Sequence, residues 1–201
     1  MEIGIIVLAA GSSSRMGRSK QLLEIDGQAL LCRCVEHALA AGPSRVVVVL
    51  GANEKPHRGL LEKLPVEIVS NFYWKTGMGS SIKTGLNYLI QSNGELDGVI
   101  LMVCDQPALT SEHLLKLIQK FHEKKKAIIA SSYSKSNGVP VLFSRSFFSN
   151  LLLLNDDQGA KKIVQQFPDQ VETVAFPKGS IDLDTEEDYQ KFLKTNKKSH
   201  P

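Results

Sequence analysis

Cysteine and aromatic residues are scarce in this chain. It holds three cysteines among 201 residues, aromatic residues make up 6%, and there is one tryptophan. An odd, small number of cysteines argues against a disulfide-stabilised secreted domain and favours reduced cysteines in the core. The five histidines show no metal-ligand spacing with one another or with the cysteines, so a zinc site is not expected.

Long hydrophobic runs and an excess of one charge are also missing. No apolar run approaches the roughly 18 residues of a membrane span, and the first residues show neither a basic leader nor a cleavage site. The formal net charge of +3 comes from three lysines within residues 194–201, and the remaining chain is neutral. We therefore expect a cytoplasmic protein with no membrane or nucleic-acid partner, in which residues 194–201 form a disordered basic tail rather than a nucleic-acid-binding arm.

The composition and the hydrophobic pattern are those of one α/β domain, expected over residues 1–193. Apolar residues make up 42% and charged residues 22% of the chain, which is typical of a globular domain. Short β-branched runs alternate with longer amphipathic stretches, which predicts strands and helices around a mostly parallel sheet. The predicted strands are residues 3–9, 46–50, 66–69, 99–103, 127–130, 139–143 and 171–175. The predicted helices are residues 29–41, 81–90, 112–121, 147–154, 160–167 and 186–193, with one more ending at 60–64.

A loop of small residues and cations follows the first predicted strand. Residues 9–20 read Ala-Ala-Gly-Ser-Ser-Ser-Arg-Met-Gly-Arg-Ser-Lys. Ligands bind beyond the carboxyl ends of the strands in such sheets. Small residues let backbone N–H groups approach a phosphate, and Arg15 and Lys20 supply positive charge. The loop matches neither the P-loop nor the Rossmann fingerprint, and an ordinary flexible turn is the alternative interpretation.

Two further segments carry polar side chains at predicted strand ends. Residues 71–81 join a strand to a helix, where Ser80 and Ser81 could bind a ligand or only cap the helix. Asp105 follows the strand 99–103, as a metal ligand or as a turn former. Asp182 and Asp184 precede the closing helix and point to the same side of an extended segment, where Asp184 could instead be the helix N-cap.

These segments resemble the nucleotidyltransferase superfamily that includes the molybdenum cofactor transferases. Residues 8–17 with Lys20 resemble its signature loop, and residues 74–81 resemble the Trp-x-x-Gly-Met-Gly-Ser-Ser element of the cytidylyltransferases. Asp105-Gln106-Pro107 resembles the metal-binding Asp-x-Pro, and residues 182–188 resemble Asp-x-Asp-Thr-Pro-Glu-Asp, with Glu186 in place of proline. The resemblance implies a Rossmann-like nucleotidyltransferase fold, a three-layer α/β/α domain with a mixed, mostly parallel sheet.

The resemblance also implies an activity and a set of site residues. The implied reaction is Mg²⁺-dependent transfer of CMP from CTP to molybdenum-molybdopterin, which gives molybdopterin cytosine dinucleotide and pyrophosphate, with a client molybdoenzyme as a further partner. The implied catalytic residues are Arg15, Lys20 and Asp105, and the implied metal ligands are Asp105 and Asp184, with Asp182 as the alternative to Asp184. The implied nucleotide-binding residues are Leu8, Ala9, Ala10, Gly11, Ser12, Ser13, Arg15, Met16, Gly17, Lys20, Gly77, Met78, Gly79, Ser80, Ser81 and Asp105.

Other nucleotides and acceptors remain open at this point. Lys161 stands where the cytidylyltransferases usually have arginine, and Val139 where they tend to have histidine. Both departures fall on the expected acceptor side. The alternatives are cytidylyl, uridylyl or guanylyl transfer to a sugar or polyol phosphate, and a non-catalytic protein that binds the nucleotide or the molybdenum cofactor and delivers it.

Overall fold

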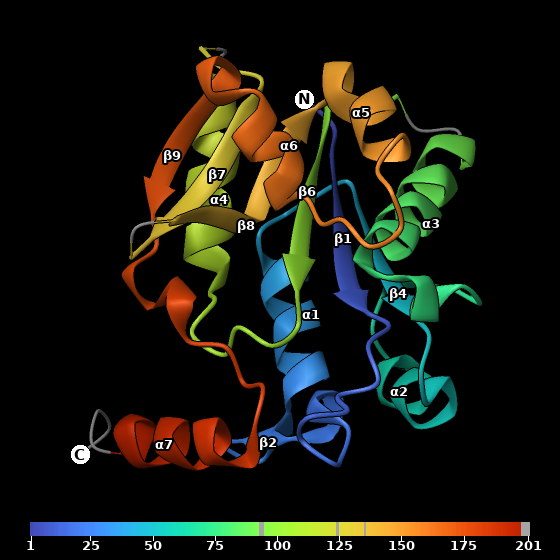
Figure 1. The fold of residues 1–201 in the computed structure, drawn as a ribbon, viewed down its shortest axis with the longest axis vertical. Helices are drawn as coiled ribbons and strands as arrows, with labels where there is room; N and C mark the ends of the chain where they lie inside the picture. The colour runs from blue at the N-terminus through green and yellow to red at the C-terminus, as the bar shows by residue number, and fades with distance from the viewer. Residues whose placement is uncertain (93–94, 124, 135, 198–201) are drawn as a thin grey trace.

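A seven-stranded sheet forms the centre of the computed structural model, which describes residues 1–92, 95–123, 125–134 and 136–197 (Figure 1). The strands lie in the order β5-β4-β1-β6-β8-β7-β9. Their bounds are Ile3–Ala9 (β1), Arg45–Leu50 (β4), Glu67–Ser70 (β5), Gly98–Val103 (β6), Ile128–Tyr133 (β7), Ser136–Ser144 (β8) and Val171–Ala175 (β9). Strand β8 is antiparallel to both neighbours, and the other pairings are parallel.

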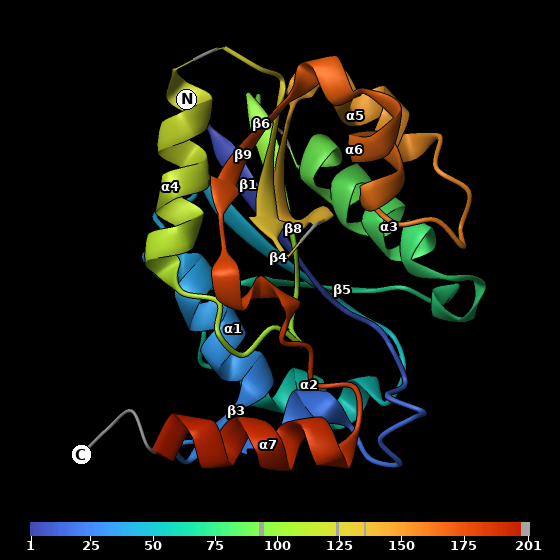
Figure 2. The ribbon, with the colours of Figure 1, turned by 60° about the vertical axis from the view of Figure 1, so that its left-hand side comes forward.

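Helices cover both faces of the sheet, as Figure 2 shows. Helices α1 (Leu30–Ala40), α2 (Glu54–Leu61) and α4 (Ser111–His122) contribute to one core, and α3 (Met78–Gln91), α5 (Phe148–Leu152) and α6 (Lys161–Gln166) to the other. Side chains of β1 alternate between them: Ile5 and Val7 enter the first core, Ile6 and Leu8 the second. This alternation is the strand period of two, and it explains why β1 is apolar along its whole length.

A third, smaller core lies beyond the carboxyl ends of the parallel strands. It joins the two-stranded hairpin of β2 (Glu24–Ile25) and β3 (Gln28–Ala29) to α7 (Glu186–Lys197). Tyr189 of α7 packs there, and its hydroxyl donates a hydrogen bond of 2.6 Å to the carbonyl oxygen of Glu24. This core fixes the end of the chain beside its first loop.

The predicted fold class is confirmed, with differences in detail. Strands β1 and β9 have the predicted bounds, whereas the hairpin and the antiparallel direction of β8 were not predicted. Helix α7 continues to Lys197, four residues further than predicted, and residues 198–201 of the expected tail lie outside the described residues.

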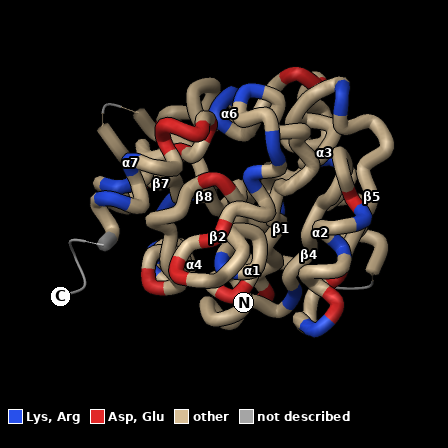
Figure 3. Tube along the Cα trace, turned by 90° about the horizontal axis from the view of Figure 1, so that it is seen from below, with Lys and Arg blue, Asp and Glu red and all other residues tan. Residues whose placement is uncertain are grey.

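Basic and acidic positions are interleaved in Figure 3. No helix in the described part of the chain is long and apolar enough to cross a bilayer.

A buried histidine in the first core gives a pH-dependent stability. His113 stacks on Phe176, and its Nε2 lies 2.7 Å from Ser131 Oγ. Burial, with a smaller effect of Lys116, lowers the pKa of His113 from 6.5 to about 4. The neutral ring is therefore favoured in the folded state, so its stabilising effect is complete above pH 6.5 and is lost as the pH falls towards 4.

We expect the free energy of unfolding to fall by about 1–2 kcal/mol between pH 7.5 and pH 5 through this histidine. Urea titrations of the wild type and of His113→Gln at both pH values measure it, because other groups titrate alike in both proteins. An identical pH dependence in the two proteins would contradict the assignment.

Candidate active site

The loop between β1 and β2 crosses the carboxyl edge of the sheet and is largely exposed. Ser13 and Gly17 have positive φ angles of 55° and 72°, which turn the chain tightly. Met16 is 8% exposed and belongs to the third core. Met16 was expected to bind the nucleotide, but its side chain is buried in the third core and anchors the loop there. The residues on either side of Met16 are exposed to solvent.

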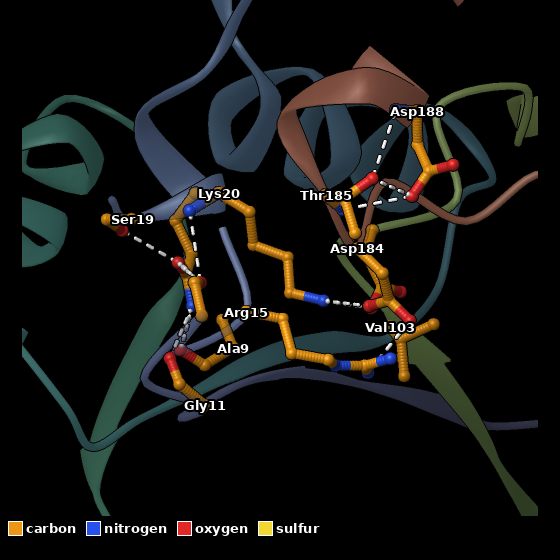
Figure 4. Close-up of polar contacts among 12 residues, drawn as sticks. Ala9, Gly11, Arg15, Ser19, Lys20, Val103, Asp184, Thr185 and Asp188 are labelled. Carbon is orange, nitrogen blue, oxygen red and sulfur yellow. Dashed lines mark hydrogen bonds and ion pairs between the residues drawn. The ribbon is translucent and has the colours of Figure 1, made fainter. Parts of the chain in front are cut away.

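Lys20 joins the loop to two carboxylates from distant parts of the chain. Its Nζ lies 2.6 Å from Asp105 Oδ2 and 3.1 Å from Asp184 Oδ1. Arg15 Nη2 lies 2.8 Å from Asp184 Oδ2, and Figure 4 shows Arg15 and Lys20 both reaching Asp184. Burial lowers the pKa of Lys20, but the charges and hydrogen bonds of Asp105 and Asp184 outweigh it, so the pKa is raised. The two carboxylates thus face each other across one ammonium group.

Main-chain contacts bring these carboxylates together. Leu183 is fully buried in the third core, and its N–H donates a hydrogen bond of 3.0 Å to the carbonyl oxygen of Asp105. The segment before α7 is thereby fixed against the end of β6. Because side chains alternate in an extended segment, burying Leu183 directs Asp182 and Asp184 to the opposite side.

The N-terminus of α7 is capped by a residue other than Asp184. Thr185 Oγ1 accepts from the N–H of Asp188 at 3.2 Å, and the Asp188 carboxylate accepts from the Thr185 N–H at 2.9 Å and hydroxyl at 2.6 Å. This reciprocal pair is a capping box, and it leaves Asp184 free of that task. The structure therefore favours a site role for Asp184 over the capping role.

Asp182 lies near the same charges without an ion pair to Lys20 in the described structure. Loss of hydration and the negative charges of Asp105 and Asp184 raise the pKa of Asp182 to about 6. Since Lys20 and Arg15 both contact Asp184, the geometry favours Asp184 over Asp182 as partner of Asp105.

The segment 71–81 is built largely for packing. Asn71 is buried and donates hydrogen bonds to Ser80 and Ser81 Oγ at 2.8 and 2.9 Å, and Ser80 donates to the carbonyl oxygens of Tyr73 and Gly77. A Cβ atom on Gly79 would lie 2.2 Å from the carbonyl oxygen of Asn155. Gly79 therefore serves the contact with the loop 155–158, and Ser80 serves contacts within the segment itself.

A cavity of about 250 Å³ connects the three segments. Its lining residues are Leu8, Ala9, Ala10, Gly11, Lys20, Gln21, Trp74, Gly77, Met78, Ser81, Val103, Cys104 and Asp105. Most were predicted as site residues, whereas Gln21, Trp74, Val103 and Cys104 were not, although Trp74 begins the segment that resembles the family's element. Gln21 could have been suspected from its place beside Lys20, but the strand end 103–104 has no polar signal. The predicted site residues that do not line this cavity are Ser12, Ser13, Arg15, Met16, Gly17, Gly79, Ser80 and Asp184.

The charged groups of this cavity are Lys20 and Asp105, and Asp184 lies beside the cavity, where it contacts Lys20. Asp105 and Asp184 offer the oxygen atoms that Mg²⁺ or Mn²⁺ prefers. No cluster of three or more histidine, cysteine, aspartate or glutamate side chains suited to a metal occurs within the described ranges. Two carboxylates suit a divalent ion that completes its shell with water and substrate phosphate.

Comparison with known proteins agrees with this chemistry. Residues 5–172 match the family described as the MobA-like NTP transferase domain. The chain is 27% identical to the purine catabolism protein PucB of Bacillus subtilis over 92% of both chains. It is 28% identical to the nicotine blue oxidoreductase of Paenarthrobacter nicotinovorans, over 94% of this chain and 95% of that protein.

A solved structure shares the fold at similar identity. The structure of Rv0371c from Mycobacterium tuberculosis in complex with manganese has a TM-score of 0.81 and 26% identity, and covers 97% of this chain and all of that chain. The predicted family resemblance is confirmed. The chain belongs to the MobA-like NTP transferase domain family and is an enzyme of the nucleotidyltransferase class.

Proposed function

We propose that this enzyme transfers CMP from CTP to a phosphorylated acceptor, with Mg²⁺ bound by Asp105 and Asp184. The observation that carries the proposal is the position of Lys20, whose ammonium contacts both carboxylates at the edge of the cavity. A cation already lies between these side chains, so their charge and spacing suit a positive ion. When bound there, Mg²⁺ would supply positive charge to the α-phosphate and orient its oxygens.

The protein's own groups account for positioning and charge stabilisation in this reaction. An oxygen of the acceptor phosphate attacks the α-phosphorus of CTP, the bond from that phosphorus to the bridging oxygen breaks, and pyrophosphate leaves with the electron pair. In this proposal Arg15 and Lys20, which contact Asp184 and Asp105 in the structure, bind the departing pyrophosphate. Backbone N–H groups of the exposed residues 11, 12 and 14 can bind the same anion. No covalent intermediate with the enzyme is needed.

The choice of CTP and of the acceptor rests on resemblance. The Ala9-Ala10-Gly11 run, residues 77–81 and Asp105-Gln106-Pro107 resemble the cytidylyl branch of the family, whose acceptor is molybdenum-molybdopterin. We propose that acceptor, with a client molybdoenzyme receiving the product.

The nucleotide choice predicts a ranking that can be measured directly. With Mg²⁺ and molybdenum-molybdopterin, pyrophosphate release should be fastest with CTP, and GTP, UTP and ATP should be at least about tenfold slower, because a base pocket that loses one hydrogen-bond match loses about 1–2 kcal/mol. Preference for GTP would contradict the assignment of CTP as the nucleotide. Activity only with a sugar or polyol phosphate would contradict the assignment of molybdenum-molybdopterin as the acceptor.

A second reaction class appears among the relatives, since one of them is named an oxidoreductase. The lysine and the paired carboxylates favour phosphoryl chemistry.

A delivery protein without catalysis is distinguished by tight CTP binding with no pyrophosphate release in the presence of acceptor and Mg²⁺.

A further inference from the structure

Gln21 fills the space beneath the loop that follows β1. It lies in a short 3₁₀ turn (Lys20–Leu22), directly after the lysine that holds the carboxylates, and it is 1% exposed. Its Nε2 donates hydrogen bonds to the carbonyl oxygens of Ala9 at 3.1 Å and Gly11 at 3.0 Å. One amide thus fixes the place where the strand becomes the loop.

The other end of the same amide binds the far part of the loop. Gln21 Oε1 accepts hydrogen bonds from Ser19 Oγ at 2.7 Å and from Ser13 Oγ at 3.2 Å. Ser13 Oγ also accepts from the N–H of Lys20 at 3.0 Å. A single buried side chain therefore connects the beginning, middle and end of the loop, which is otherwise largely exposed.

A buried histidine supports this network from behind. His57 of α2 is fully buried, and its Nε2 lies 2.6 Å from Ser19 Oγ. Since the Ser19 hydroxyl donates to Gln21, the proton of this contact comes from His57 Nε2. Burial lowers the pKa of His57, which favours the neutral ring that can donate from Nε2 alone.

The network has a consequence for binding of anions. A flexible loop loses conformational freedom when it closes on a ligand, and carbonyl oxygens that turn towards a phosphate repel it. Gln21 removes both costs, because it orders the loop beforehand and occupies the carbonyl oxygens of Ala9 and Gly11. The backbone N–H groups of the loop are then left for the ligand.

We infer that Gln21, supported by Ser19 and His57, is a positioning residue that holds the loop in its phosphate-binding shape before the nucleotide arrives. The inference rests on the proposed nucleotidyl transfer and adds a residue outside the predicted site. If the inference holds, replacing Gln21 weakens the binding of the triphosphate group and leaves the binding of the nucleoside unchanged.

The test uses Gln21→Met, which keeps the length of the side chain and removes its hydrogen bonds. Trp74 is the single tryptophan and lines the cavity, so its fluorescence can report binding. We expect CTP and inorganic pyrophosphate to bind roughly 10- to 100-fold more weakly, because the four hydrogen bonds by which Gln21 orders the loop are lost. CMP should bind within about threefold of the wild type. Unchanged CTP binding, or an equal loss for CMP, would overturn the inference.

Two further variants separate this role from general destabilisation. Ser131→Ala removes buried hydrogen bonds to His113 and Pro140, far from the loop, and should lower stability without changing CTP binding. Ser19→Ala cuts the link between Gln21 and His57 in a partly exposed residue, so it provides the test if Gln21→Met does not fold. Ser19→Ala should weaken the binding of CTP and leave the binding of CMP unchanged. If the variant binds both ligands as tightly as the wild type does, the inference is overturned.

The wild type supplies the remaining distinction. If it binds CTP no more tightly than CMP, the proposed nucleotidyl transfer fails, whatever the variants show. If the wild type prefers CTP and Gln21→Met keeps the full preference, only the role of Gln21 fails.

Discussion

Replacing Asp105 by asparagine should lower kcat about 10²–10³-fold while the protein keeps its fold. The substitution preserves the size of the side chain but removes the charge that faces Lys20 at 2.6 Å and that we assign to Mg²⁺. The backbone carbonyl of Asp105, which holds Leu183, is unchanged. Pyrophosphate release with CTP, acceptor and Mg²⁺ measures the effect, and circular dichroism checks the fold.

A matched control flanks the other end of β6. Asp97 precedes β6 and accepts a hydrogen bond from the N–H of Glu2 at the opposite edge of the sheet, so Asp97→Asn should keep near-normal kcat. Turnover by Asp105→Asn comparable to that of Asp97→Asn would rule out the metal role.

Replacing Lys20 by methionine should have two opposite effects. Turnover should fall about 10²–10³-fold, because the charge near the departing pyrophosphate is lost. Binding of Mn²⁺ without nucleotide should become about tenfold tighter or more, since a divalent ion about 4 Å from an elementary positive charge is repelled by about 2 kcal/mol even in water. Electron paramagnetic resonance of free Mn²⁺ measures the second effect independently of turnover.

Lys120 is the matched control, because it also contacts two carboxylates. Lys120 lies on α4, Glu123 follows that helix, and Glu172 lies on β9. Lys120→Met should change neither turnover nor Mn²⁺ binding. If Lys20→Met bound Mn²⁺ more weakly than the wild type, Lys20 and the metal would not share the carboxylates. The expected result implies that the triphosphate draws Lys20 away from Asp105 and Asp184, so nucleotide and metal promote each other's binding.

The fold was largely predictable from local patterns. Buried parallel strands are apolar on both faces, so β1 could be delimited by its β-branched run alone. The direction of β8 could not, because hydrophobic alternation is the same for parallel and antiparallel pairing. The two-residue strands β2 and β3 are too short to show any period.

The candidate site was predictable mainly from the family resemblance. Charge and position left Asp105 and Asp184 open between a metal site and a turn or helix cap, and the resemblance implied the site role. The structure brings both carboxylates together with Lys20. Residues that serve a contact with another segment were harder to interpret from the sequence. The glycine at position 79 is explained only by the close approach of the loop 155–158. The role of Gln21 is explained only by its hydrogen bonds to the carbonyl oxygens of Ala9 and Gly11.

The contact between Leu183 and the carbonyl of Asp105 also separates the sheet from the assembly of the proposed metal site. All seven strands of the sheet are complete at Ala175, before Leu183 and Asp184 in the chain. The sheet therefore contains neither the segment that carries Asp184 nor the main-chain contact that holds it. Under the proposed function, proteolytic removal of the chain from residue 183 onward would take away one of the two carboxylates and leave every strand intact.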